Sequence, residues 1–186
     1  MKALLLSLLM LGATAGDVKP RPDGAQPPPV VAIKSPAGAL PELTGRVVDR
    51  AGILPRNVEA ALTGRLAALE KATTDQLVVV TVPSLGGEPI KDFGLRLGNS
   101  WGIGRKGVDN GVLLIVAPAE RWARIEVGRG LEGLLTDQRA QRIMDEQVVP
   151  ACRRGRCDRA IVDGVEAIMA VLSSETERPR RKRGIA

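Results

Sequence analysis

The sequence predicts an α/β fold, a single α/β/α sandwich domain with a mixed central sheet and helices on both faces. Two continuous apolar runs, residues 76–82 and 111–117, have the composition of strands that are buried on both faces. Segments with helical periodicity alternate with these runs, and this order is typical of a sheet covered by helices. The folded domain is expected at residues 43–173, a normal length for one core.

The first half of this domain is predicted to contain two helices and one strand. Residues 58–69 repeat apolar side chains at helical spacing after Pro55, a residue type favoured in the first turn of a helix. The strand 76–82 follows and stops at Pro83, which cannot donate a backbone hydrogen bond. Residues 90–99 then have the pattern of a second helix.

The second half is predicted to form a hairpin followed by two helices. The strand 111–117 ends at Pro118, and a short turn leads to residues 122–127. Those residues alternate in polarity, which indicates a half-exposed strand antiparallel to the one before it. Apolar side chains recur at helical spacing in residues 137–149 and again in residues 158–172.

The N-terminus has the layout of a cleavable signal peptide at residues 1–15. Lys2 precedes an apolar run, and small residues end at Ala15, so cleavage is expected before Gly16. The alternative is a retained anchor, but a helix needs about 20 apolar residues to cross a bilayer. The mature protein is therefore expected to be periplasmic or secreted.

The segments that flank the domain are expected to lie outside the fold. Residues 16–42 are crowded with prolines and predict a semi-extended linker. Residues 174–186 hold a run of basic side chains and predict a disordered basic tail. The tail could contact anionic lipid or remain solvated, and nucleic acid is not expected as a partner. Its basic residues are Arg178, Arg180, Arg181, Lys182 and Arg183.

Two common kinds of chemistry are disfavoured by the sequence. The chain contains no histidine, which excludes Ser-His-Asp and Cys-His catalysis as well as imidazole metal ligands. Residues 102–107 and 128–133 both match G-x-G-x-x-G. The first match precedes a strand, and residues 134–136 separate the second from the next helix, so neither has the strand-to-helix context that dinucleotide binding requires. No nucleotide cofactor is expected. These glycines are instead expected to allow turns with positive φ and close backbone approach.

Oxygen donors are predicted to converge at one edge of the sheet. The hairpin brings Glu132 and Asp137, which follow its second strand, near Asp109 and Asn110, which precede its first. Carboxylate and amide oxygens are the ligands that Ca²⁺ and Mg²⁺ prefer. Two structural alternatives stay open, because Asp109 and Asn110 suit a turn before a strand and either Thr136 or Asp137 suits a helix N-cap.

Cys152 and Cys157 lie between the last two predicted helices. In an exported protein this spacing favours a disulfide over a redox or zinc site. The alternative is a pair of free thiols.

Several motifs, taken together and in this order, resemble the TPM-domain family from about residue 47 to residue 172. They are Ser84-Leu85-Gly86-Gly87, Trp101-Gly102-Ile103-Gly104, Lys106-Gly107, Asp109-Asn110-Gly111-Val112-Leu113-Leu114, Arg124-Ile125-Glu126-Val127-Gly128, Gly130-Leu131-Glu132-Gly133 and Leu135-Thr136-Asp137. This family includes thylakoid-lumen acid-phosphatase-like proteins and many exported bacterial proteins. The resemblance implies an α/β/α sandwich on the non-cytoplasmic side of a membrane, with a divalent-cation site in some members and acid phosphatase activity in plant members.

The resemblance carries a set of site residues onto this chain. The matched positions are Asp109, Asn110, Glu132 and Asp137, with Asp49 as a weaker one. The chain also departs from the family. Arg129 stands where a tyrosine is usual, and the two cysteines stand where relatives look aromatic. Many bacterial members end in a transmembrane helix or glycine-rich tail, whereas this chain ends in arginine and lysine.

The sequence therefore leads to two functional hypotheses from different classes. The first is an exported accessory domain that binds a divalent cation and acts through a membrane or envelope protein. The alternative is a metal-assisted acid phosphatase that hydrolyses phosphomonoesters, so whether the chain is an enzyme stays open. A third interpretation assigns the function to the proline-rich linker and the basic tail.

Overall fold

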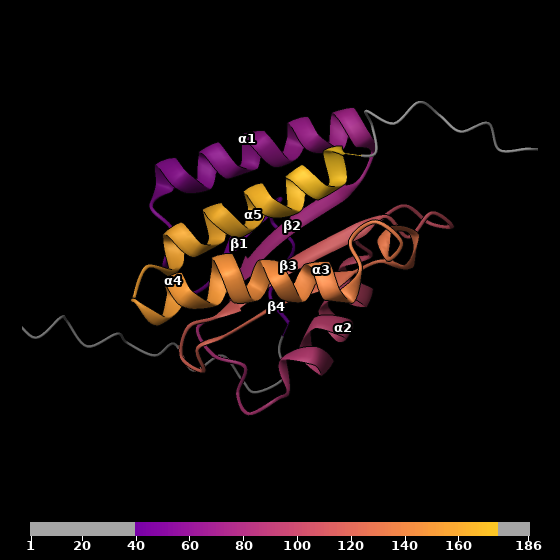
Figure 1. Cartoon of the computed structure of the whole chain (residues 1–186). Helices are drawn as coiled ribbons and strands as arrows, with labels where there is room; N and C mark the ends of the chain where they lie inside the picture. The colour runs from indigo at the N-terminus through magenta and orange to yellow at the C-terminus, as the bar shows by residue number, and fades with distance from the viewer. Residues whose placement is uncertain (1–39, 175–186) are drawn as a thin grey trace, which may run out of the picture. The chain divides into compact units, whose positions relative to one another are not determined.

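The computed structural model describes residues 40–174, which form a four-stranded sheet with helices on both faces (Figure 1). The strand order is β1-β2-β3-β4, in which β1, β2 and β3 are parallel and β4 is antiparallel to β3. The strands are β1 (Val47–Asp49), β2 (Gln76–Thr81), β3 (Gly111–Ala117) and β4 (Trp122–Val127). The mixed sheet predicted from the sequence is confirmed. The predicted signal peptide, most of the predicted linker and the basic tail lie outside the described residues.

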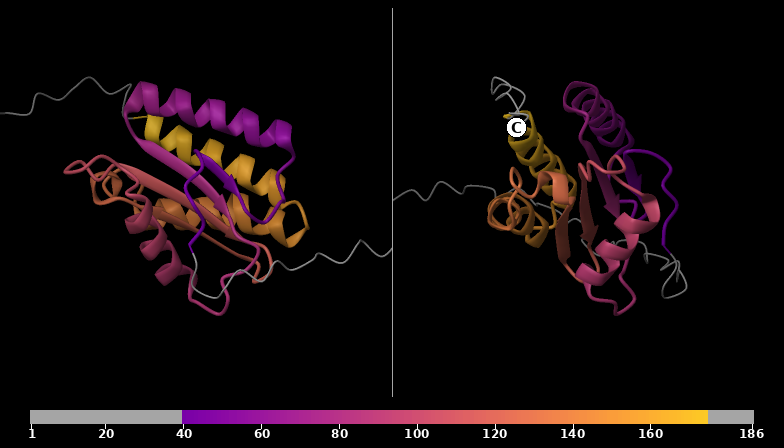
Figure 2. Two further views of the ribbon diagram at one scale, coloured as in Figure 1. Left: turned by 180° about the vertical axis from the view of Figure 1, so that it is seen from behind. Right: turned by 90° about the vertical axis from the view of Figure 1, so that its right-hand side faces the viewer.

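One helix covers one face of the sheet and the remaining helices cover the other (Figure 2). The helix α2 packs on the first face, where Phe93 and Leu97 join a cluster with alternate residues of β2 and β3. On the second face α1 and α5 lie beside the short helices that precede α5. The helices are α1 (Arg56–Thr73), α2 (Ile90–Trp101), α3 (Asp137–Ile143), α4 (Val149–Arg153) and α5 (Cys157–Ser173).

The central strands are apolar on both faces because both faces are covered. Successive residues of a strand point to opposite faces, so Leu77 and Val79 join the cluster under α1 and α5 while Val78 and Val80 join the cluster under α2. Every residue of β3 is buried. This two-sided burial explains the continuous apolar runs in the sequence.

The structure differs from the sequence-based expectation at two places. The strand β1 is only three residues long, too short for a periodic pattern to reveal it. The single helix expected at residues 137–149 is α3, then a π-helical turn at Met144–Val148, then α4. Pro150 has no amide N–H and its ring crowds the preceding turn, which favours this widening of the helix.

Among residues 40–174, no helix combines the length and the apolar character that a membrane span requires.

Candidate functional site

A groove of about 500 Å³ opens where α2 meets the start of β3 and the end of β4. Three acidic side chains line it, Asp109, Glu126 and Glu132, and we call it the acidic groove. Arg129 is the basic residue in its wall, and Leu95 from α2 contributes a half-exposed apolar side chain. The antiparallel pairing of β3 and β4 produces this arrangement, because Val112 pairs with Val127.

Two glycine-rich segments pack backbone against backbone beside the acidic groove. The amide of Gly128 donates to the Gly111 carbonyl at 2.7 Å, and the amide of Gly130 donates to the Asp109 carbonyl at 3.1 Å. A Cβ atom at Gly104, where φ is +98°, would lie 2.8 Å from the Gly111 nitrogen. The two G-x-G-x-x-G matches thus serve close packing and a left-handed turn, as the sequence predicted.

Asn110 is buried and holds three chain segments together. Its Oδ1 accepts from the amide of Arg105 at 2.9 Å, and its Nδ2 donates to the Thr74 carbonyl at 2.8 Å and to the Asp75 carboxylate at 3.1 Å. The residue is only 2% exposed. These hydrogen bonds occupy the amide group, so its role in the structure is to fix the loop that presents Asp109.

The same loop is tied to the body of the domain by Gln76. Its Oε1 accepts from the amide of Gly104 at 2.8 Å, while its Nε2 donates to Glu70 at 3.0 Å. Glu70 in turn accepts from Arg46, at 2.9 Å from Nε and 2.6 Å from Nη2. Hydrogen bonds from Arg46 first, and from Gln76 second, lower the pKa of the Glu70 carboxyl.

We expect Glu70→Gln to reduce the dependence of the free energy of unfolding on pH at acidic pH. Because the folded-state pKa of Glu70 is lowered, its stabilisation is fully present above the ordinary glutamate pKa and is lost as pH falls through the folded-state value. Urea unfolding measured from neutral pH down to about pH 3 tests this. Arg46→Gln removes the main cause and is expected to give the same flattening. An unchanged slope in both variants would contradict the linkage.

The predicted donors are distributed over several places. Asp109 and Glu132 share the acidic groove, whereas the Asn110 side chain points into the structure. Asp137 begins α3 and lines a different hollow, of about 380 Å³, together with Lys91. The N-cap of α3 is Thr136, whose Oγ1 accepts from the amide at position 139.

Asp49 lies at the opposite end of the sheet from the acidic groove. It pairs in register with Thr81, which pairs with Val116 near the end of β3. Its carboxylate accepts from the amides of Ile53 at 3.3 Å and Leu54 at 2.8 Å and from the Thr81 hydroxyl. Asp49 therefore shapes the turn after β1. Among the described residues, no three or more acidic, cysteine or histidine side chains are grouped so that they could hold a metal ion.

Two residues of the acidic groove were not predicted from the sequence. Glu126 lies on β4, and its carboxylate is ion-paired with Arg124. A Cβ atom at Gly94 would lie 2.8 Å from Glu126 Oε1, so the glycine in α2 makes room for this carboxylate. The alternation of β4 was the signal available for Glu126. No local pattern indicated that α2 would supply Leu95.

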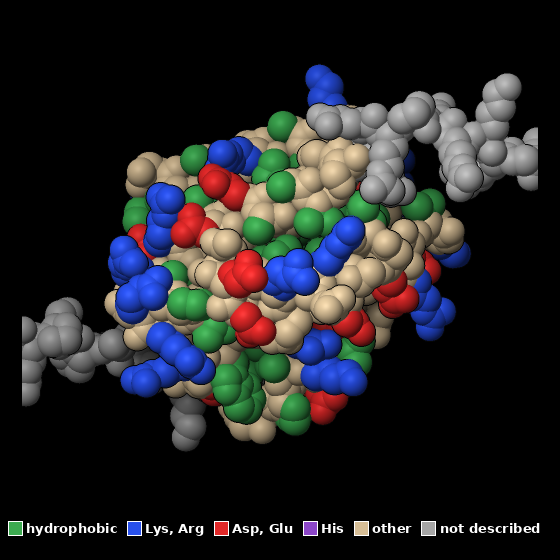
Figure 3. Space-filling model, viewed as in Figure 1, with side chains coloured by type: hydrophobic (Ala, Val, Ile, Leu, Met, Phe, Trp, Pro, Cys, Tyr) green, Lys and Arg blue, Asp and Glu red, His purple; other side chains and the backbone are tan. Residues whose placement is uncertain are grey.

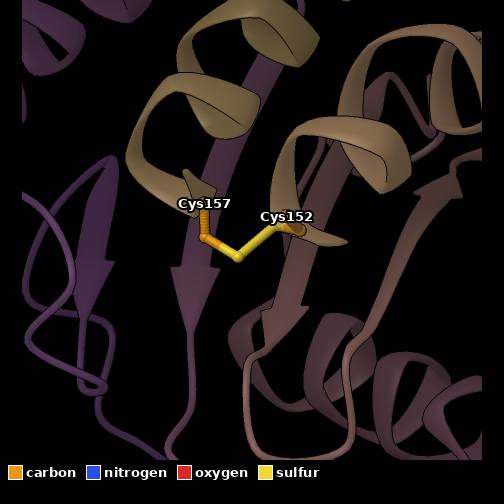
Figure 4. Close-up of a disulfide and its surroundings, with 2 residues drawn as sticks. All are labelled: Cys152 and Cys157. Atoms are coloured by element: carbon orange, nitrogen blue, oxygen red, sulfur yellow. A yellow bond between two sulfur atoms is a disulfide. The ribbon is translucent and has the colours of Figure 1, made fainter. Parts of the chain in front are cut away.

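The predicted disulfide between Cys152 and Cys157 is present and joins the end of α4 to the start of α5 (Figure 4). The Cα atoms are 4.2 Å apart, and Gly155 turns the short loop with φ of +73°. Lys and Arg side chains gather at this end of the domain (Figure 3). Arg153, Arg154 and Arg156 are all exposed there.

The chain is similar to one known domain family and to solved structures of bacterial proteins. The TPM domain family matches residues 47–171. The N-terminal domain of a protein from P. gingivalis is 37% identical, with a TM-score of 0.68 over 72% of this chain and 85% of that one. No curated protein matches the chain.

Two more distant solved structures are similar in fold alone. The N-terminal domain of the cg2496 protein from Corynebacterium glutamicum is 15% identical, with a TM-score of 0.57 over 77% of this chain and 89% of that one. The BA42 protein from the psychrophilic bacterium Bizionia argentinensis is 19% identical, with a TM-score of 0.57 over 65% of this chain and 82% of that one.

Proposed function

We propose that this chain, which belongs to the TPM domain family, is an exported accessory domain that binds a divalent cation in its acidic groove and docks onto a membrane or envelope protein. The observation that carries the proposal is the acidic groove, where Asp109 and Glu132 from separate segments lie with the half-exposed Leu95. The signal-peptide pattern of residues 1–15 supports export.

The donor set of the groove suits a weakly bound hard cation. Ca²⁺ takes six to eight oxygen ligands, and Mg²⁺ keeps several of its waters. Asp109 and Glu132 would supply carboxylates, while Glu126 is already paired with Arg124. Backbone carbonyls and water would complete the shell. Two available carboxylates favour a dissociation constant of about 10⁻⁴ to 10⁻³ M, the range of extracellular modules.

The rim of the groove has the composition of a protein-binding surface. Leu95 is 49% exposed and Val108, next to Asp109, is 51% exposed. Apolar side chains beside charged ones are common where one protein docks on another. A cation between the carboxylates would reduce the negative charge of the groove, so docking of an apolar partner segment is expected to strengthen when the cation is bound.

Calcium titration followed by residue-resolved NMR tests the cation site. We expect amide shifts confined to residues 105–110 and 128–132, with half-saturation at about 10⁻⁴ to 10⁻³ M. Asp109→Asn and Glu132→Gln each remove one carboxylate charge and are expected to weaken binding about tenfold.

The matched control is Asp137→Asn, which removes an acid that lines a different hollow. It is expected to leave the titration unchanged. Shifts that are absent from both segments, or an equal loss in Asp137→Asn, would contradict the proposed site.

The alternative function is a metal-assisted acid phosphatase. That activity needs an open metal position that holds and activates a water molecule. We expect no phosphomonoester turnover above that of buffer at acidic pH, with either Ca²⁺ or Mg²⁺ present. Metal-dependent turnover that disappears in Asp109→Asn would replace the docking proposal with the phosphatase.

A further inference from the structure

A second groove, of about 470 Å³, lies at the other end of the sheet and has the disulfide in its wall. We call it the disulfide groove. It is bounded by the end of β3 at Ala117, by Trp122 and by the junction of α4 and α5. Cys152 and Cys157 both line it and are both partly exposed, and Cys152 also packs against the hydrophobic core.

The two sulfur atoms have different surroundings (Figure 4). Cys157 is the first residue of α5, a helix of 17 residues, and Cys152 lies in the last turn of α4. The N-cap residue of α5, Arg156, makes no side-chain hydrogen bond to the first amides of the helix. A helix N-terminus and neighbouring cations both favour a thiolate over a thiol.

The charges that face this pair are mostly positive. Arg121 from the turn between β3 and β4 and Arg153 from α4 line the disulfide groove, while Asp158 from α5 is the acidic residue in its wall. The loop between the cysteines adds Arg154 and Arg156. A thiolate released at this position would therefore lie in a positive potential.

We propose that Cys152–Cys157 is a redox-active disulfide that oxidises pairs of thiols in peptide segments held in the disulfide groove. Trp122, which is 50% exposed, together with Ile53 and Val149 gives this groove an apolar wall beside the cysteines. Such a wall suits an extended peptide with apolar side chains next to its cysteines.

The exchange has two steps. A thiolate of the substrate attacks Sγ of Cys152, the S–S bond breaks, and its electron pair leaves on Sγ of Cys157, the better leaving group because the helix terminus stabilises it. The second thiolate of the substrate then attacks the substrate sulfur of this mixed disulfide and releases Cys152. Two electrons and two protons pass to the protein, and the substrate keeps the new disulfide. A low-molecular-weight disulfide then reoxidises the protein through two further thiol–disulfide exchanges and is itself reduced to two thiols.

The proposal predicts an unusual relation between folding and reduction. A structural disulfide is stabilised by the fold, so it is harder to reduce than the same disulfide in a short unfolded peptide. In the proposed case the fold stabilises the thiolate of Cys157 and makes the disulfide easier to reduce. The reduced protein is then the more stable form towards denaturant.

The full chain and a synthetic peptide with the sequence of residues 152–157 are equilibrated with glutathione at several ratios of reduced to oxidised glutathione. The free thiols are then trapped by alkylation and counted by mass spectrometry. We expect the equilibrium constant for reduction to be at least about tenfold larger in the protein. Reduction that is equal or less favourable in the protein would overturn the proposal. The peptide keeps the same arginines, so the comparison isolates the effect of the fold.

Two variants test the groove itself. Arg153→Gln with Arg156→Gln is expected to make the pair harder to reduce by about threefold or more, while Arg105→Gln at the other end of the sheet leaves it unchanged. Trp122→Ala is expected to slow oxidation of a dithiol peptide but not of a small dithiol. Two results would contradict a substrate site in the disulfide groove. One is an equal effect on reduction from the double variant at Arg153 and Arg156 and from the control Arg105→Gln, and the other is no slowing of peptide oxidation in Trp122→Ala.

Discussion

Gly130→Ala is expected to destabilise the domain by about 3 kcal/mol or more. A Cβ atom at this position would overlap the carbonyl oxygen of Val108, which is backbone and cannot rotate away. The amide of Gly130 also donates to the Asp109 carbonyl, so any shift that relieves the overlap weakens that hydrogen bond. Denaturant unfolding followed by fluorescence of the two tryptophans measures the loss.

Gly133→Ala is the matched control for this experiment. It lies in the same segment, but a Cβ atom there would have no neighbour within 4 Å. Its effect is expected to stay within about 0.5 kcal/mol. The cation titration gives a second reading, because Gly130→Ala also displaces the turn that carries Glu132 relative to Asp109. Similar stabilities for Gly130→Ala and Gly133→Ala would show that the backbone at Gly130 does not need to lie so close to the backbone at Val108.

The sheet could be predicted largely because its strands are bounded by strong signals. The strand β3 has the predicted bounds, Gly111–Ala117, since a glycine opens the apolar run and Pro118 closes it. The strand β4 also has its predicted bounds, Trp122–Val127, because its polarity alternates. The strand β1 has only three residues and is defined by its pairing with β2, which no local pattern contains.

The candidate site was predictable only in part, for a related reason. A hairpin brings the ends of its two strands together, so the shared groove of Asp109 and Glu132 follows from strand order. The direction in which an individual side chain points does not follow from strand order. Asn110 donates to Thr74, 36 positions away in the chain, and Asp49 accepts from the amides of its own turn. Such partners are fixed by tertiary contacts and by local backbone geometry.

Asn110→Ala is expected to cost about 2 to 4 kcal/mol of stability. The change removes the acceptor for the amide of Arg105 and the donor for the carbonyl of Thr74, and it leaves a small cavity in their place. The cost is large because the site is buried, so the orphaned groups have little access to water. Urea unfolding measures it, and Asn99→Ala provides a control at an exposed asparagine of α2.

Asn110→Asp separates this structural role from a role as a cation ligand. The carboxylate keeps the acceptor for Arg105 but places negative charge against the Thr74 carbonyl, where the amide group had donated. Stability is therefore expected to fall at neutral pH and to recover in part near about pH 4, where a protonated carboxyl can donate. If Asn110 instead bound the cation directly, Asn110→Asp would tighten calcium binding, because a ligand of greater charge attracts the ion more strongly. Tighter calcium binding with unchanged stability would show that Asn110 is a cation ligand and not a structural residue.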